Sequence, residues 1–120
     1  MAISKATRDD ILFILFDDAR LLEETRIEQV EKELADAIDA STEKRIVLDF
    51  SKVQFMSSSM LGKLVKVNKQ CKSFKIKLKL CSVSPDILEV FKITRLDKLF
   101  DIEADAEAAR KALVKKGLFG

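Results

Sequence analysis

The sequence predicts an α/β domain with a largely parallel sheet, because two kinds of pattern alternate along it. Short apolar stretches and stretches with a two-residue period, such as residues 10–16 and 44–50, are typical of strands. The longer segments between them have apolar residues every three to four positions, as amphipathic helices do. Strands that alternate with such helices favour parallel pairing with right-handed crossovers. With 120 residues, 48% of them hydrophobic, we expect one domain over residues 1–120.

The first strand is predicted over residues 10–16, a nearly continuous apolar stretch that suits a buried position. A helix is predicted to begin at Thr25, because Thr25 and Glu28 have the spacing of a capping box. In that motif the threonine hydroxyl accepts a hydrogen bond from the backbone N–H of Glu28, and the carboxylate reaches back to the helix start. The expected buried stripe of this helix is Ile27, Val30, Leu34 and Ile38, with Glu31, Glu33, Asp36 and Asp39 mostly toward water.

A second strand at residues 44–50 carries apolar side chains at alternate positions and leads into three serines, Ser57, Ser58 and Ser59. From Ser58 the apolar period becomes helical, so the serines are expected where a strand gives way to a helix. The buried arc of that helix should be Met60, Leu61, Leu64, Val67 and Cys71, and its solvent side should carry Lys63, Lys66, Lys69 and Lys72.

Residues 75–80 alternate lysine with aliphatic residues, which predicts a strand with one packed and one wet face. Helices should therefore not cover both sheet faces fully. Ser84 is expected to cap the next helix, with Pro85 at its first position and Asp86 near the positive end of its dipole. After a short strand-like stretch at residues 100–102, Asp105 can cap a last helix. Its inward residues should be Ala106, Ala109 and Leu113, and its end is expected at Lys115, Lys116 and Gly117.

The charges are divided unevenly along the chain. Residues 17–43 contain ten acids and three bases, whereas residues 52–85 contain eight lysines and no acid. We therefore expect one acidic and one basic surface. Lysine-rich faces are usually only solvated, and no aromatic residue interleaves the lysines of residues 75–79. Weak, salt-sensitive attraction to anions is thus the most expected, without specific nucleic-acid binding.

Other features exclude several classes of site and location. Cys71 and Cys81 have neither metal-binding nor redox spacing, which predicts two reduced core thiols. Metal-ligand clusters are missing from the sequence, and neither a metal nor a cofactor is expected. The longest wholly apolar run, residues 11–16, is too short to cross a membrane. No basic-then-apolar leader opens the sequence, so a cytoplasmic protein without membrane insertion is expected.

The three serines do not fit a catalytic site. The chain has no histidine to act as a base, and no lysine lies three residues after any of the three serines. Glycine patterns that cradle phosphates are also absent, so no enzyme is predicted. Ser57 or Ser58 is expected to cap the helix, which leaves surplus hydroxyls at a helix start. A surplus hydroxyl there is well placed for phosphorylation by another protein's active site.

The segment VLDFSKVQFMSSSMLGKL, residues 47–64, resembles the signature of the STAS domain of anti-sigma factor antagonists. Residues 83–102, VSPDILEVFKITRLDKLFDI, look like the segment that follows in this family. The resemblance implies a STAS fold: an α/β domain whose mixed, mostly parallel sheet has four to five strands, with about four helices.

The family also implies partner switching that regulates transcription. An unmodified antagonist binds an anti-sigma factor of the GHKL kinase type, phosphorylation by that kinase separates the two, and a serine phosphatase resets the cycle. Carried onto this sequence, the phosphorylation acceptor is Ser58. The partner-binding loop and helix start are then Ser57, Ser59, Met60, Gly62 and Lys63.

Three positions depart from the family pattern. Ser57 stands in place of an aspartate, so it can still cap the helix but offers a partner no carboxylate. Met60 replaces a glycine and is expected to present a flexible apolar side chain to a partner. Arg95 also replaces a glycine and is expected to change the conformation of its loop. These departures leave an alternative open: a non-switching STAS module, either a scaffold subunit or the soluble partner of a membrane transport assembly.

Overall fold

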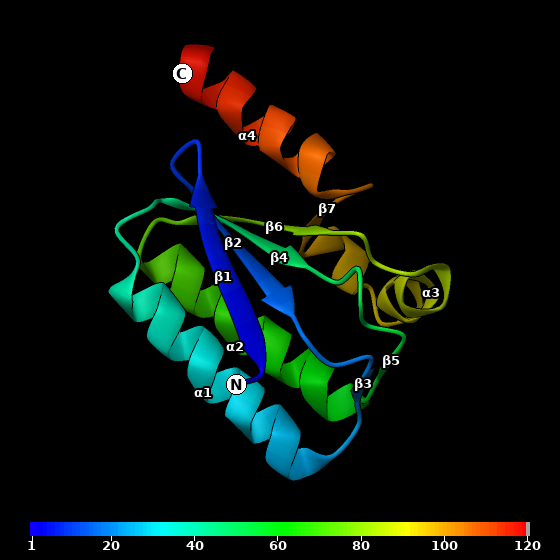
Figure 1. Cartoon of the computed structure of the whole chain (residues 1–120). Helices are drawn as coiled ribbons and strands as arrows, with labels where there is room; N and C mark the ends of the chain where they lie inside the picture. The colour runs from blue at the N-terminus through cyan, green and yellow to red at the C-terminus, as the bar shows by residue number, and fades with distance from the viewer. Residues whose placement is uncertain (120) are drawn as a thin grey trace.

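A computed structural model of the chain describes residues 1–119, with side chains through residue 114 (Figure 1). Its main sheet has five strands in the order β1-β2-β4-β6-β7, and a two-stranded sheet pairs β3 with β5. Only β1 and β2 pair antiparallel; all other neighbours are parallel. The strands are β1 (Ile3–Arg8), β2 (Ile11–Phe16), β3 (Arg20–Leu21), β4 (Arg45–Asp49), β5 (Phe55–Met56), β6 (Lys77–Cys81) and β7 (Asp101–Glu103).

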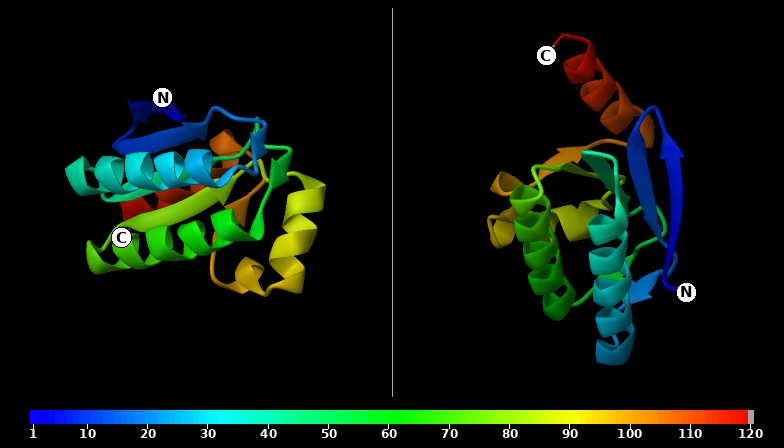
Figure 2. Two further views of the ribbon diagram at one scale, coloured as in Figure 1. Left: turned by 90° about the horizontal axis from the view of Figure 1, so that it is seen from below. Right: turned by 90° about the vertical axis from the view of Figure 1, so that its left-hand side faces the viewer.

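Helices lie on both faces of the main sheet, but unequally. Two long helices, α1 (Glu24–Ala40) and α2 (Ser58–Ser73), lie side by side on one face (Figures 1 and 2). On the other face α4 (Ala106–Phe119) packs Ala109 and Leu113 against Ile11, Val47 and Cys81. The remaining helix, α3 (Pro85–Ile93), is followed by the short 3-10 helix η1 (Leu96–Lys98). The predicted α/β architecture with a mixed, mostly parallel sheet is therefore confirmed.

The predicted apolar stripes are also confirmed. All four stripe residues of α1 and all five of α2 are buried, as are Ala109 and Leu113 of α4. Ser84 caps α3 by accepting a hydrogen bond from the Ile87 N–H at 3.3 Å. Asp105 caps α4 through the Ala108 N–H at 2.8 Å. These elements were predictable because periodicity and capping are local signals.

Element boundaries differ from the predictions by one or two residues in several places, and three of these differences concern predicted start or stop signals. Helix α1 begins at Glu24, and no side chain caps it; Thr25 and Glu28 lie inside its first turns, so the capping box does not form. Strand β6 begins at Lys77 instead of Lys75, because Lys75 has a positive φ of 59° that ends the α2 segment. The backbone of α4 continues through the expected stop at residues 115–117 to Phe119; the side chains of those residues lie outside the described part.

Strand β1 was missed because it has no apolar period: after Ile3 all of its residues are exposed. It is held by pairing with β2 across the two-residue turn Asp9-Asp10, where φ is 53° and 61°. Such turns usually carry asparagine and glycine, which tolerate positive φ, so the turn signal was also weak. The short strands β3 and β5 form only by pairing with each other over a long sequence separation.

Two of the four acids expected to face water on α1 are engaged instead. The Glu33 carboxylate accepts hydrogen bonds from the Ala2 N–H at 2.9 and 3.1 Å and from the Ile3 N–H at 3.2 Å, which anchors the start of β1. Glu31 is half-buried and faces α2, whereas Asp36 and Asp39 are exposed as expected.

The two cysteines are free and buried, which confirms the prediction of core thiols. Burial raises the pKa of the Cys71 thiol to about 11, and burial together with nearby carboxylates raises that of Cys81 to about 12. Both therefore stay protonated and unreactive near neutral pH. Within residues 1–119, no helix is long and apolar enough to cross a membrane.

The expected wet face of β6 is wrong at Lys79, which is only 6% exposed. Its ammonium group lies 2.9 Å from a Glu103 carboxylate oxygen and 3.8 Å from one of Asp101. Both acids belong to β7, which pairs alongside β6. The alternating pattern identified the strand correctly, but the ion pairs depend on a neighbour that the pattern does not show.

We expect Lys79→Ala to lower the free energy of unfolding by about 2 kcal/mol, because it removes a buried cation from between two acids. The matched control is Lys77→Ala, since Lys77 lies on the same strand and the same face but is exposed. That variant should stay within about 0.5 kcal/mol of the parent. Urea unfolding of the three proteins measures the difference, and equal losses in both variants would contradict the structural role of Lys79.

Candidate functional site

The three serines lie beyond the carboxyl ends of the parallel strands. Strand β4 ends at Asp49, and the chain returns through β5 to the start of α2. There the Ser57 N–H donates to the carbonyl of Leu21 at 3.0 Å, which fixes the serines beside the segment that leads into α1. Both helices therefore begin at the same edge of the molecule (Figure 1). In open α/β sheets this edge is where binding sites are usually found.

Each serine hydroxyl has a different environment. Ser57 is the N-cap of α2, and its Oγ accepts a hydrogen bond from the Met60 N–H at 3.4 Å. Ser59 Oγ donates to the Glu24 carboxylate at 2.8 Å. Ser58 is exposed at the first position of the helix, and among the described residues its hydroxyl has no hydrogen-bond partner. Only the Ser58 hydroxyl is thus both exposed and uncommitted.

The other predicted contact residues are not all at the surface. Met60 is 0% exposed and packs in the core, so it cannot present an apolar side chain to a partner as expected. The helical period explains this, because Met60 belongs to the buried arc of α2. Gly62 is exposed, one turn after Ser58 on the same side of the helix. A Cβ atom at Gly62 would meet nothing within 4 Å, so the surrounding structure does not require a glycine there.

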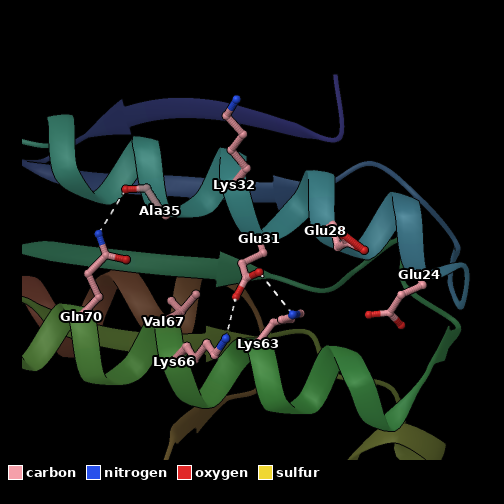
Figure 3. A pocket seen from close by; sticks show the side chains of 9 residues that line it. All are labelled: Glu24, Glu28, Glu31, Lys32, Ala35, Lys63, Lys66, Val67 and Gln70. Carbon is pink, nitrogen blue, oxygen red and sulfur yellow. Dashed lines mark hydrogen bonds and ion pairs between the residues drawn. The ribbon is translucent and has the colours of Figure 1, made fainter.

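Lys63 points into a groove between α1 and α2, away from open solvent (Figure 3). Its ammonium group lies 3.3 Å from one Glu31 carboxylate oxygen, and that of Lys66 lies 3.6 Å from the other. Further along the groove the Gln70 amide donates to the Ala35 carbonyl at 3.1 Å. The acidic face of α1 and the basic face of α2 therefore neutralise each other in part.

Two exposed apolar side chains flank the serines, and sequence reasoning did not identify them. Leu22 is 42% exposed and Phe55 is 49% exposed. Phe55 is the first residue of β5, and Leu22 directly follows β3, with which β5 pairs. The Arg20 guanidinium lies 4.9 Å from the centre of the Phe55 ring. Aromatic and arginine side chains of this kind often dominate binding at protein interfaces. The sequence did contain one signal for this apolar surface, namely Phe55, two residues before Ser57.

Arg95 lies in the loop between α3 and η1. It adopts the left-handed conformation, φ 62° and ψ 17°, that glycine takes most readily. A glycine could adopt the same conformation at this position, and the expected change of the loop stays a prediction. An arginine in this conformation costs about 1 kcal/mol relative to glycine.

Comparison with known proteins identifies the family. The model of the STAS domain matches residues 2–109. The chain belongs to the STAS domain family. A relative named as a proposed anti-sigma factor antagonist, BtrV of Bordetella bronchiseptica, is 36% identical over 85 residues, which cover 71% of this chain and 72% of that protein.

Solved STAS structures confirm the fold. A STAS domain protein from Planctomyces limnophilus, described as an anti-sigma factor antagonist, superposes with a TM-score of 0.82 at 28% identity, over 93% of this chain and 98% of that one. The phosphorylated form of the Bacillus cell fate determinant SpoIIAA gives a TM-score of 0.69 at 20% identity, over 92% and 99%. At that identity the second likeness concerns the fold alone.

The site has no arrangement typical of a metal centre. In the part of the chain that the structure describes, no group of three or more histidine, cysteine, aspartate or glutamate residues is placed to hold a metal ion.

We expect Ser57→Ala to lower the free energy of unfolding by about 1 kcal/mol, because it removes the cap of α2. Ser58→Ala is the matched control: the hydroxyl is one residue away, exposed and unpaired, so the change should stay within about 0.5 kcal/mol. Thermal or urea unfolding measures both. A larger loss in Ser58→Ala than in Ser57→Ala would reverse the assignment of cap and free hydroxyl.

Proposed function

We propose that this STAS protein is a single-domain, non-enzymatic anti-sigma factor antagonist. It binds an anti-sigma factor of the GHKL kinase type, and phosphorylation at Ser58 ends the interaction. A serine phosphatase would restore the binding form, and transcription is the process that this switch regulates. The observation that carries the proposal is the Ser58 hydroxyl, exposed and free at a helix start between two serines that are already engaged.

The engaged serines indicate why the acceptor is Ser58. Modification of Ser57 would remove the helix cap, and modification of Ser59 would place a phosphate against the Glu24 carboxylate. Neither cost applies directly to Ser58. A kinase also needs access to its acceptor, and the absence of a side chain at Gly62 leaves the helix surface open one turn away.

The energetics favour dissociation without unfolding. A phosphoserine carries a charge of about −1.5 to −2, which a helix start stabilises by up to about 2 kcal/mol. Repulsion from Glu24 offsets part of this gain, so the folded domain should tolerate the modification. In a bound complex the same charge would be buried, and an unpaired buried charge costs about 3 kcal/mol, equivalent to roughly 150-fold in affinity.

The surface around Ser58 is suited to a protein partner. Leu22 and Phe55 provide apolar area, and Arg20 provides a planar cation stacked on an aromatic ring. The similarity to BtrV supports an anti-sigma factor as the class of partner. SpoIIAA has been solved in phosphorylated and unphosphorylated forms, so a protein of this fold can carry a phosphate.

The test uses candidate GHKL-type anti-sigma factors and ATP. We expect intact mass to show one added phosphate, which peptide mapping places on Ser58 and which is absent in Ser58→Ala. The phosphorylated protein should lose about 100-fold in affinity by calorimetry, while its unfolding free energy changes by less than about 1 kcal/mol.

Ser59→Ala serves as the control, since it should still be phosphorylated. Full affinity after modification, or melting of the domain, would contradict the proposal. Binding without modification by any candidate kinase would instead favour the non-switching module, a scaffold subunit or the soluble partner of a membrane transport assembly.

Gly62 offers a second test that separates binding from stability. Gly62→Ala should raise the free energy of unfolding by up to about 1 kcal/mol, because alanine favours the helix and its Cβ meets nothing. Gly62→Gln should be stable too, yet weaken the anti-sigma factor complex about tenfold or more by occupying the surface beside Ser58. Calorimetry and urea unfolding measure the two effects; unchanged affinity in Gly62→Gln would place the partner elsewhere.

A further inference from the structure

A cluster of cations surrounds an exposed phenylalanine at the end of the molecule opposite the serines. Phe74 is 39% exposed and follows the last residue of α2. We call this cluster the basic end; its members are Lys44, Arg45, Lys72, Phe74, Lys75 and Lys77.

Hydrogen bonds and strand pairing bring these residues together at one edge, although they come from three segments. Lys44 Nζ donates to the Phe74 carbonyl at 3.3 Å, and the Lys77 N–H donates to the Lys44 carbonyl at 2.8 Å. The Lys75 N–H donates to the Lys72 carbonyl at 3.1 Å, and Arg45 pairs with Lys77 in the β4–β6 ladder. These contacts gather the residues at one edge of the molecule, where Lys72, Phe74 and Lys75 lie at the end of α2 on one side of the sheet and Arg45 and Lys77 project from the side that α4 covers.

The cations of the basic end are not neutralised by ion pairs with the side chains that the structure describes. Within the part of the chain whose side chains are described, none of the five cations forms an ion pair. Two acids lie nearby: Glu43 accepts hydrogen bonds from the Ser41 and Thr42 hydroxyls in the turn before β4, and Asp10 lines a shallow pocket with Lys44 and Arg45. Lys44 and Lys72 lie near the carboxyl end of α2, where a cation interacts favourably with the helix dipole. This interaction does not explain the presence of Arg45, Lys75, Lys77 or the exposed Phe74 ring.

The composition of the basic end favours a lipid surface over other anions. Four of its five cations are lysines, which are strongly hydrated point charges; arginine is preferred for nucleic acids and for paired charges at protein interfaces. One phenylalanine cannot form a stacking platform for successive bases. A membrane surface instead presents mobile anionic headgroups to several lysines at once and accepts an apolar ring at the headgroup boundary.

We propose that the basic end binds anionic membrane surfaces, with Phe74 inserting among the headgroups. The binding is peripheral and reversible. Lys44, Arg45 and Lys77 lie at the amino ends of β4 and β6, whereas Ser58 lies beyond the carboxyl ends, roughly 24 Å away along α2. The serine edge therefore faces solution when the basic end contacts lipid, and the proposal does not depend on phosphorylation.

The test is co-sedimentation of the full chain with vesicles of phosphatidylcholine containing about 30% phosphatidylglycerol. We expect binding at about 50 mM salt that is lost at about 500 mM, and none to phosphatidylcholine alone. The double variant Lys72→Gln/Lys75→Gln should lower the partition coefficient about 25-fold, since each lysine contributes about fivefold. Phe74→Ser should lower it roughly threefold at constant charge.

The matched control is Lys52→Gln/Lys66→Gln, which changes the net charge equally but at exposed sites outside the basic end. It should retain most of the binding. Absence of vesicle binding at low salt, or equal losses in both double variants, would overturn the proposal. So would single-stranded DNA that binds as tightly as the vesicles through Lys72 and Lys75, because the basic end would then be a nucleic-acid surface.

Discussion

The parallel pairing of β2, β4 and β6 is the constraint on which the rest of the structure depends. Each parallel step needs a crossover, and α1 and α2 supply the first two on the same face of the sheet. Because both crossovers start after a carboxyl end, both helices begin at one edge and end at the other. This places Glu24 beside Ser59 and brings the acids of α1 opposite the lysines of α2.

The same constraint separates the roles of the three serines. A helix that starts directly after a strand needs a cap, and Ser57 provides it. The adjacent start of α1 engages Ser59 through Glu24. Ser58 is exposed at the start of α2. One helical turn later, Gly62 has no side chain, so the surface beside Ser58 is open. Of the three hydroxyls in the sequence, two are thus hydrogen-bonded in the structure, and that of Ser58 is the exposed one without a partner among the described residues.

Much of the fold was predictable because its signals are local. The buried stripes of α1 and α2, the Ser84 cap and the Asp105 cap all follow from residues within one or two turns. What could not be predicted depends on partners far along the chain. Strand β1 lacks an apolar period and exists through β2, and Lys79 is buried only because β7 lies beside it.

The site shows the same division. The sequence predicted that the site lies at a strand-to-helix junction, and residues 47–64 resemble a known signature. The burial of Met60 could also be predicted, because the helical period places Met60 in the buried arc of α2. The assignment of Met60 to a partner-binding surface conflicted with that period. The hydrogen bond from Ser59 to Glu24, which lies 35 residues away in the sequence, could not be predicted. The exposure of Leu22 and Phe55 could not be predicted either, since they come together only where β3 pairs with β5, far along the chain.

Electrostatic screening keeps the two ends of α2 independent. The helix separates Ser58 from the basic end by roughly 24 Å, whereas charges in physiological salt are screened over about 8 Å. A phosphate at Ser58 therefore changes the local potential strongly and the potential at Lys72 and Lys75 very little. Coupling between the ends would require a rearrangement of α2, and α2 is held along its length by a buried arc from Met60 to Cys71. On this geometry a partner could be exchanged at one end while the other remains in contact with lipid.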